Sequence, residues 1–221
     1  MFKKIQPYAH SYYKKLEIKD HHLLYLFLEI TRRCNLNCIH CGSDCKADFN
    51  AKELTTDSWL KIIDYMSDRY SKELMFVITG GEPLVYKELL TICKHIQKKG
   101  RRWGMVTNAM LLSEKNLQGL LKAGMYSITL SFDGLKESHN KLRNNEGSYD
   151  KVIQALFLTG KTDLKFKDVV TCVYPDNLNQ LDEIAEIILK TGMTSWRLFR
   201  IFPSGRAENN PHTQLSFLQT Q

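Results

Sequence analysis

Four cysteines stand close together near the start of the chain. The stretch TRRCNLNCIHCGSDC, residues 31–45, contains Cys34, Cys38, Cys41 and Cys45, although the chain has only six cysteines. Thiolates this close in sequence can bind metal or can react. Structural zinc commonly takes two C-x2-C pairs, and that pairing is absent. The C-x3-C-x2-C triplet instead suits three corners of an iron–sulfur cubane and leaves its fourth iron without a protein ligand.

Cys45 leaves the state of that fourth iron open. If Cys45 is a ligand, the run becomes C-x3-C-x2-C-x3-C, which resembles a ferredoxin-type motif and fills every corner. We favour a non-ligand role, because a closed electron carrier would have no use for the unusual residues described below. Cys93 falls in an amphipathic pattern and Cys172 in an apolar run, and there we expect small buried apolar residues.

The elements that must position the cysteines follow a regular apolar pattern. Six runs rich in β-branched and aromatic residues predict strands, and amphipathic stretches between them predict helices. The predicted strands are 24–30, 75–79, 103–107, 126–132, 168–173 and 196–202, and the predicted helices are 56–70, 86–99, 113–123, 148–158 and 178–190. Alternating strands and helices predict βαβ units and a parallel sheet. Periodicity alone leaves both a barrel and an open doubly wound sheet as alternatives.

Unusual residues follow the predicted strands at their carboxyl ends. These are the cysteine loop after Thr31, GGEP (80–83), Asn108, Asp133 and PSGR (203–206). In parallel α/β folds the carboxyl ends of the strands converge on one mouth. We therefore expect the functional site to gather around the cysteines.

The cysteine loop and the GGEP motif together resemble the radical S-adenosylmethionine (SAM) superfamily. Further similarity lies in VTNAM, SFDG, HNKLR, GSYDKVI and FPSGRA, and it covers nearly all of residues 24–207. The broader pattern is similar to the branch of peptide-modifying maturases, sulfatase-maturating enzymes and related cofactor-biosynthesis enzymes. Members of this branch commonly carry a C-terminal cysteine-rich extension, called SPASM or twitch. No such extension follows here, so we expect a truncated product or a member that lacks it.

The resemblance implies a fold and a domain organisation. The fold is an α/β partial TIM barrel of six units, (β/α)6, with a parallel sheet that is open on one side for a large substrate. The six units come from the apolar pattern, and the openness comes from the resemblance. Residues 1–23 would be an N-terminal extension, 24–207 the core domain and 208–221 a C-terminal tail.

The resemblance also implies the cofactors and their ligands. Cys34, Cys38 and Cys41 would hold a [4Fe-4S] cluster whose open iron binds the amino and carboxylate groups of SAM. An electron from the cluster would then cleave SAM to a 5'-deoxyadenosyl radical that abstracts a substrate hydrogen. Glycine backbone can approach the ammonium group closely, and a guanidinium fork suits the carboxylate. The residues implied to contact SAM are His40, Gly80, Gly81, Glu82, Thr107, Asn108, Ser131, Asp133, Arg143 and Leu198.

Several of these assignments have plainer alternatives. His40 would stack on the adenine, and the alternative is an exposed or supporting loop histidine. Asn108 and Asp133 also suit turns, the latter as part of an Asp-Gly pair. Leu198 would cover the adenine, and the alternative is one more core leucine.

The expected function is that of a radical SAM enzyme acting on a peptide, a protein or a cofactor precursor. The alternative is a non-catalytic iron–sulfur or zinc protein, or an inactive fragment that binds SAM. A reducing donor such as flavodoxin or ferredoxin would supply electrons, and a basic surface could attract it. The residues nominate no general acid or base.

Charge and hydropathy exclude other classes. The net charge is +7, and the densest basic run, KHIQKKGRR (94–102), is typical of a solvated helix end. It has no interleaved aromatic residues, so a nucleic-acid partner is not expected. No apolar run is long enough to cross a bilayer, and the early lysines precede no apolar segment, which indicates a cytoplasmic protein.

Overall fold

A computed structural model describes residues 10–16, 18, 22–50, 52–216 and 219. The predicted N-terminal extension and C-terminal tail therefore lie partly outside the described residues. Their boundaries, and those of the core domain, stay predictions.

Six parallel strands form one sheet in the order β1-β2-β3-β4-β5-β6. Within the described residues β1 pairs only with β2, and β6 pairs only with β5, so the sheet stays open between its first and last strands. The strands are β1 Tyr25–Glu29, β2 Met75–Thr79, β3 Arg102–Thr107, β4 Ser127–Ser131, β5 Phe166–Val173 and β6 Ser195–Arg200. The predicted open (β/α)6 partial barrel is confirmed.

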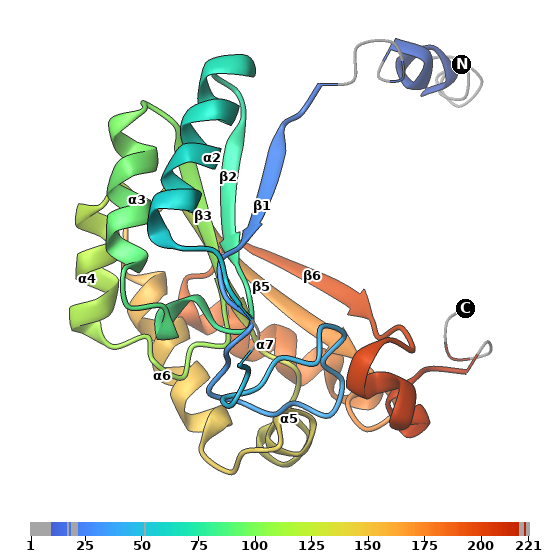
Figure 1. Ribbon diagram of the computed structural model, residues 1–221. Helices are drawn as coiled ribbons and strands as arrows, with labels where there is room; N and C mark the ends of the chain where they lie inside the picture. The colour runs from blue at the N-terminus through green and yellow to red at the C-terminus, as the bar shows by residue number, and fades with distance from the viewer. Residues whose placement is uncertain (1–9, 17, 19–21, 51, 217–218, 220–221) are drawn as a thin grey trace.

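The helices cross between consecutive strands. Because every crossover joins neighbouring parallel strands with the same hand, the crossover helices gather on one face of the sheet, as Figure 1 shows for α2, α3, α4 and α6. The helices are α2 Thr56–Arg69, α3 Leu89–Lys98, α4 Glu114–Lys122, α5 Lys136–Arg143, α6 Ser148–Gly160 and α7 Leu181–Thr191. Single 3-10 turns are η1 Pro83–Val85, η2 Leu178–Gln180, η3 Gly205–Asn209 and η4 Pro211–Thr213.

Side-chain caps fix the first turns of two helices. The hydroxyl of Thr55 accepts a hydrogen bond from Ser58 N at the start of α2. Ser113 does the same for Asn116 N at the start of α4. Each cap satisfies a backbone donor that has no partner inside the helix.

The core lies between the sheet and the helices. Successive residues of a strand face opposite sides, and the residues on the helix side, such as Phe76, Trp103 and Ile128, are fully buried. The opposite face, which we call the inner face, carries aromatic side chains that remain accessible. Phe27 on β1 is 64% exposed, and Phe199 on β6 is 47% exposed. The sheet thus exposes aromatic rings beside its opening, on a face that also carries the ion pair of Asp168 and Arg197.

One helix departs from the predicted alternation. α5 and α6 both lie between β4 and β5, whereas the pattern predicted only the second. The α5 sequence, KESHNKLR, has no apolar stripe of helical period, and most of its buried side chains are polar. The helix is held by specific hydrogen bonds rather than by an apolar face, so hydrophobic periodicity could not reveal it.

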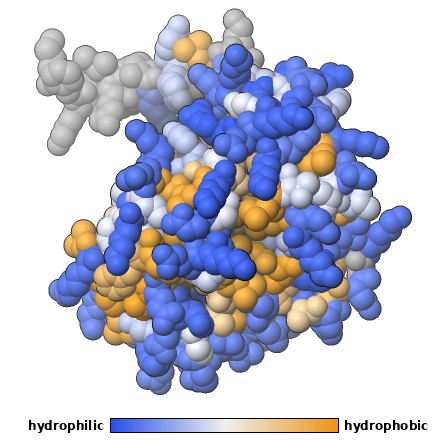
Figure 2. All heavy atoms as spheres, turned by 90° about the vertical axis from the view of Figure 1, so that its left-hand side faces the viewer, coloured by the Kyte–Doolittle hydropathy of each residue, from blue (hydrophilic) through white to orange (hydrophobic). Residues whose placement is uncertain are grey.

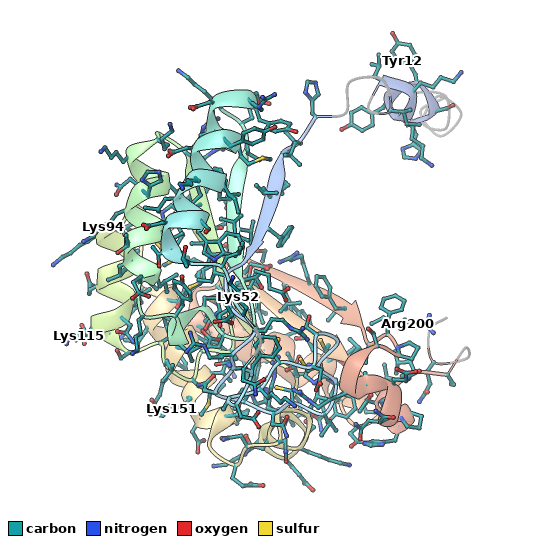
Figure 3. All side chains as sticks on the ribbon, viewed as in Figure 1. Tyr12, Lys52, Lys94, Lys115, Lys151 and Arg200 are labelled. Atoms are coloured by element: carbon teal, nitrogen blue, oxygen red, sulfur yellow. The ribbon has the colours of Figure 1, made fainter. Side chains whose placement is uncertain are left out.

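The outer surface is largely hydrophilic. Figure 2, which faces the helix layer, shows polar side chains with apolar ones between them. Lys94, Lys115 and Lys151 project away from this layer, whereas Arg200 lies on the other side of the molecule near the C-terminal segment (Figure 3). No helix in the described part of the chain combines the length and hydropathy needed to cross a membrane.

Candidate active site

A cavity of about 360 Å³ opens beside the cysteine loop, where the carboxyl ends of the strands meet. Pockets of this size commonly bind small ligands. Of the residues predicted from sequence, its wall contains Cys34, Cys38, His40, Cys41, Gly80, Gly81, Asn108 and Arg143. The wall does not include Glu82, Thr107, Ser131, Asp133 or Leu198. The structure therefore brings together the cysteines, the glycine loop and the arginine.

The sulfur of each triplet cysteine accepts an N–H. Hydrogen bonds of this kind stabilise the thiolate, which is the form of cysteine that binds metal. The donors and sulfurs are Leu36 N to Cys34 Sγ at 3.4 Å, Arg143 Nη1 to Cys38 Sγ at 3.8 Å and Cys45 N to Cys41 Sγ at 3.4 Å. Asn108 Nδ2 adds a second donor, 3.7 Å from Cys34 Sγ.

The thiols of Cys34 and Cys45 each point to an oxygen, Cys34 Sγ lying 4.0 Å from Asn35 Oδ1. Within the described residues the sulfur of Cys45 differs from the three others in that no N–H donates to it. The Cys45 thiol donates to Ser43 O at 3.8 Å. The backbone N–H of Cys45 donates to the sulfur of Cys41. The interaction of the Cys45 side chain with the Cys41 side chain, together with burial, raises the pKa of Cys45. The same side-chain interaction, helped by the backbone N–H of Cys45, lowers the pKa of Cys41 to about 5. Local contacts thus favour a thiolate at Cys41 and a thiol at Cys45.

The two remaining thiols are buried in low-dielectric surroundings. Burial raises the pKa of Cys34 to about 11. Burial also raises the pKa of Cys38, although Arg143 opposes the shift. Both thiols must release their protons when they bind metal, so metal binding at this site is coupled to proton release.

The cysteine side chains can be compared with the ligand sets of a single ion and of a cluster. Across the residues that the structure describes, no three His, Cys, Asp or Glu side chains converge on a position for one metal ion. Tetrahedral zinc needs its ligands on one centre. The cysteines of a cubane instead bind different irons and stand farther apart. Three thiolates on one cavity wall are the donor set that a [4Fe-4S] cluster with one open iron requires.

A buried ion pair fixes Arg143 beside the cysteines. Asp133 Oδ2 accepts from Arg143 Nε at 2.6 Å and lies 2.5 Å from Nη2, and neither side chain is more than 10% exposed. Asp133 Oδ1 accepts from Cys172 N at 2.8 Å. Burial alone would raise the pKa of Asp133, but the charge of Arg143 holds that pKa below its usual value. Asp133 therefore positions Arg143 and does not itself reach the cavity.

Glu82 and Thr107 are turned into the protein. Glu82 is fully buried, and Oε1 accepts from Leu84 N at 3.1 Å and from Thr107 Oγ1 at 2.8 Å. Its Oε2 accepts from Asn108 N at 2.8 Å. Burial raises the pKa of Glu82 despite these donors. The carboxylate joins the loops that follow β2 and β3, instead of presenting its charge on the cavity wall.

His40 lies on the cavity wall as a neutral ring. Burial and the nearby charge of Arg143 lower its pKa to about 4. Its Nδ1 lies 3.4 Å from Leu142 O. A neutral imidazole can stack on an aromatic base, so contact with the adenine stays a prediction that this placement allows.

The strand register separates Leu198 from the cavity. Leu198 pairs with Thr171 on β5 and shares the helix-side face with Trp196, whereas the next residue, Phe199, pairs with Cys172. Phe199 and Cys172 both line the cavity. Sequence reasoning missed these two, although the alternation of side chains along β5 and β6 carries the signal. Ser131 is on the inner face of β4 but does not reach the cavity wall.

The two glycines allow the second loop to lie against the start of the cysteine loop. Gly81 N donates to Thr31 O at 2.7 Å, and Glu82 N donates to Arg33 O at 3.0 Å. A Cβ on Gly81 would stand 2.4 Å from Arg33 O, and one on Gly80 would stand 2.4 Å from Thr31 O. Both contacts are with backbone and too close for any side chain.

Gly81→Ala should therefore displace the cysteine loop. We expect a loss of about 1–3 kcal/mol in the free energy of unfolding, as in other overpacked sites, and less iron bound per chain after anaerobic reconstitution. Urea unfolding and iron analysis would measure the two effects. Gly119→Ala is the matched control, because a Cβ there meets only Leu90 at ordinary contact distance. Equal iron content in both variants would contradict this account.

His139 makes the stability of the fold depend on pH. Its Nδ1 accepts from Asp133 N at 3.0 Å, its Nε2 lies 3.0 Å from Ser148 Oγ, and burial lowers its pKa to about 4. An unfolded histidine has a pKa of about 6.5. As the pH falls below that value, the unfolded state takes up the proton first, so stability is lost.

Between pH 7 and pH 5 this group should reduce the free energy of unfolding by about 2 kcal/mol. Urea unfolding of the wild type and of His139→Asn at the two pH values tests this. The Asn side chain can still accept from Asp133 N, and the variant should lose about 2 kcal/mol less over the same interval. An identical pH dependence in the two proteins would rule out this role.

A comparison with protein families shows which superfamily the chain belongs to. Residues 28–188 match the family described as the Radical SAM superfamily. This chain belongs to the radical SAM superfamily. The superfamily that the motifs predicted is thus confirmed, and its cofactors are a [4Fe-4S] cluster and SAM. The three cysteines whose sulfurs accept N–H groups are those of the C-x3-C-x2-C motif.

Curated relatives include enzymes of two kinds. The chain is 29% identical over 183 residues to an AdoMet-dependent heme synthase of Methanosarcina barkeri, covering 82% of this chain and 52% of that protein. It is 31% identical over 165 residues to a PqqA peptide cyclase of Bradyrhizobium diazoefficiens, covering 74% of this chain and 43% of that protein. The chain thus spans about half the length of these relatives.

Solved structures share the fold. SuiB of Streptococcus suis bound to S-adenosylmethionine superimposes with a TM-score of 0.72 at 17% identity, over 97% of this chain and 48% of SuiB. SuiB bound to its precursor peptide SuiA gives a TM-score of 0.71 over the same share of this chain. At this identity the likeness concerns the fold alone.

Proposed function

We propose that this chain is the catalytic core of a radical SAM enzyme that modifies a peptide or a protein. One observation carries the proposal: the sulfurs of Cys34, Cys38 and Cys41 line one cavity and each accepts an N–H, whereas among the described residues no N–H donates to the sulfur of Cys45, which lies 3.8 Å from Ser43 O. Three thiolate ligands leave one iron for SAM. When bound, the cluster and SAM supply the electron and the adenosyl fragment with which hydrogen is abstracted from the substrate.

The residues around the cavity are proposed to bind SAM and to orient it and the cysteine ligands. Arg143 places a guanidinium, held by Asp133, where a carboxylate of SAM can pair with it. Gly80 and Gly81 bring backbone without side chains to the wall of the cavity. Asn108, whose backbone Glu82 holds, donates to Cys34 and to Asn35 Oδ1 at 2.9 Å. The protein contributes positioning and exclusion of water.

The inner face of the sheet is the proposed path of the substrate. It leads from the open side between β1 and β6 to the cavity, and the exposed rings of Phe27 and Phe199 give it apolar contact area. A peptide can lie along such an open surface. The relatives that act on or bind peptides, the PqqA cyclase and SuiB, support this substrate class.

The heme synthases support a second candidate, a small cofactor precursor. The exposed aromatic rings of the inner face would also suit a planar macrocycle. To distinguish the two candidate substrate classes, a peptide and a cofactor precursor are each offered to the reconstituted protein. Mass spectrometry then shows which of them is modified.

The decisive test is cleavage of SAM. We expect the chain, reconstituted with iron and sulfide without oxygen and reduced with dithionite, to release 5'-deoxyadenosine from SAM. Iron binding without 5'-deoxyadenosine would favour the alternative, a non-catalytic cluster protein or an inactive fragment. For the donor in the cell we propose an acidic flavodoxin or ferredoxin, which the net positive charge would attract. Reduced thiols favour a cytoplasmic location.

A further inference from the structure

The segment that follows β6 folds back onto the cysteine loop. We call residues 204–210 the clasp. In Figure 1 this segment, drawn in red, lies beside the loop that follows β1, drawn in blue. Residues 208–210 of the predicted C-terminal tail are part of the clasp, and the boundary of that tail stays a prediction. The clasp joins the two ends of the core across the opening of the sheet.

Arg206 makes most of the contacts between the clasp and the loop. Its backbone N donates to Cys41 O at 2.9 Å, and its Nε donates to Cys38 O at 2.7 Å. Its Nη1 donates to Cys45 O at 2.9 Å and to Asp44 Oδ1 at 2.8 Å. One residue therefore holds the backbone at three of the four clustered cysteines.

Other residues of the clasp bring it close to the loop. Asn210 Nδ2 donates to Ile39 O at 3.2 Å, and Ser204 Oγ donates to Gly42 O at 3.3 Å. Gly205 has φ of 56°, and a Cβ at this position would stand 2.5 Å from Cys41 O. Only glycine adopts this conformation and allows this approach without strain.

These contacts also fix the position of Cys45. It lines the cavity together with Cys34, Cys38 and Cys41, and it is only 2% exposed. Arg206 holds its carbonyl, and the neighbouring Lys46 O accepts from Cys34 N at 3.2 Å. With the backbone fixed in this way, the N–H of Cys45 points to Cys41, and its thiol points to Ser43 O.

A thiol this close to the cluster is a competitor of SAM. A tethered ligand acts at a high effective concentration, so a small movement of the loop would let Cys45 reach the open iron. In that exchange the thiol would release its proton to solvent, an iron–sulfur bond would form, and the amino and carboxylate groups of SAM would leave. No electron is transferred, and the cluster would be closed by four cysteines.

We propose that Arg206 is a positioning residue that keeps Cys45 from binding the open iron, so that this iron remains available to SAM. The inference rests on the proposed function. It assigns a role to the clasp and explains how a fourth cysteine can stand at the site of an open cluster. Loosening of the clasp should let Cys45 bind the open iron, so that SAM can no longer bind there. Removal of the Cys45 thiol should restore the binding of SAM.

The test compares Arg206→Gln, Cys45→Ala and the double variant. Each is reconstituted without oxygen and reduced, and the electron paramagnetic resonance spectrum of its cluster is recorded with and without SAM. We expect the SAM-dependent change to be present in the wild type and in Cys45→Ala, lost in Arg206→Gln and restored in the double variant. Iron content and circular dichroism of every variant establish that the cluster and the fold are present.

Arg101→Gln is the matched control. Arg101 also donates to several backbone carbonyls, those of Ser67, Tyr70 and Ser71, but at the amino ends of the strands. This variant should respond to SAM as the wild type does. A normal SAM response in Arg206→Gln would overturn the inference, and so would a loss of iron or of the response that persists in the double variant. A wild type without any SAM response would instead reject the proposed function.

Discussion

Cys38→Ala is expected to abolish cleavage of SAM, to below one part in a thousand of the wild-type rate of 5'-deoxyadenosine formation. The side chain lies on the cavity wall, and its sulfur accepts from Arg143 Nη1. Without this thiolate the cluster loses one of three protein ligands. Activity depends on the cluster, so a loss of ~4 kcal/mol or more in transition-state stabilisation follows, which corresponds to about a thousandfold.

Cys45→Ala is the matched variant of this experiment. It removes a cysteine from the same loop but leaves the backbone N–H that donates to Cys41 Sγ. We expect unchanged iron content and the wild-type rate of 5'-deoxyadenosine formation. Iron analysis and the visible absorption of the reconstituted cluster accompany the assay. If Cys45→Ala lost the cluster and Cys38→Ala kept it, the assignment of ligands would be wrong.

Asp133→Ala is expected to have the largest effect on stability. Removing the carboxylate leaves the buried guanidinium of Arg143 without its partner, and breaking a buried ion pair in this way commonly costs about 3–5 kcal/mol. The free Cys172 N–H adds to the cost. Urea unfolding would measure the loss. Binding of SAM should weaken as well, because Arg143 would no longer be held beside Cys38.

Asp176→Ala provides the comparison for Asp133→Ala. Asp176 pairs with Lys141 at 2.6 Å, but both side chains are more than 40% exposed. Exposed pairs of this kind contribute about 0–1 kcal/mol. The two variants should therefore differ by several kcal/mol in the free energy of unfolding. Similar values would show that the Arg143–Asp133 pair is not an essential support of the site.

The strands were predictable because their apolar residues are dense and periodic. All six lie within two residues of their predicted ends, since a buried parallel strand reads as an apolar run. The α5 helix was not predictable in the same way. Its buried residues, among them His139 and Asn140, are polar, and they are stabilised by partners such as Ser148 Oγ and Glu146 O. Such contacts depend on the tertiary structure and leave no periodic pattern.

The candidate site, too, could be predicted only in part. Residue type and spacing sufficed for the cysteines and for the glycine loop, where chemistry and close backbone approach restrict the choice. The direction of individual side chains did not follow from spacing. Glu82 turns inward because three donors converge on it, and Phe199 rather than Leu198 faces the cavity because of a one-residue step in strand register.

The individual contacts of the clasp could not be predicted from local sequence. Arg206 lies more than 160 positions from the carbonyls of Cys38 and Cys45 that it binds. The sequence placed PSGR (203–206) at the same mouth as the cysteines, but residue type and spacing did not show which carbonyls Arg206 would bind. Its role becomes visible when the fold places it beside the cysteines.

The central claim is that the cluster held by Cys34, Cys38 and Cys41 has one iron free for SAM. Electron–nuclear double resonance on the reduced cluster, with SAM isotopically labelled at its amino nitrogen and carboxylate oxygen, measures this contact directly. The account predicts magnetic coupling of both labelled atoms to the cluster. An intact cluster that shows no coupling to either atom at saturating SAM would contradict it.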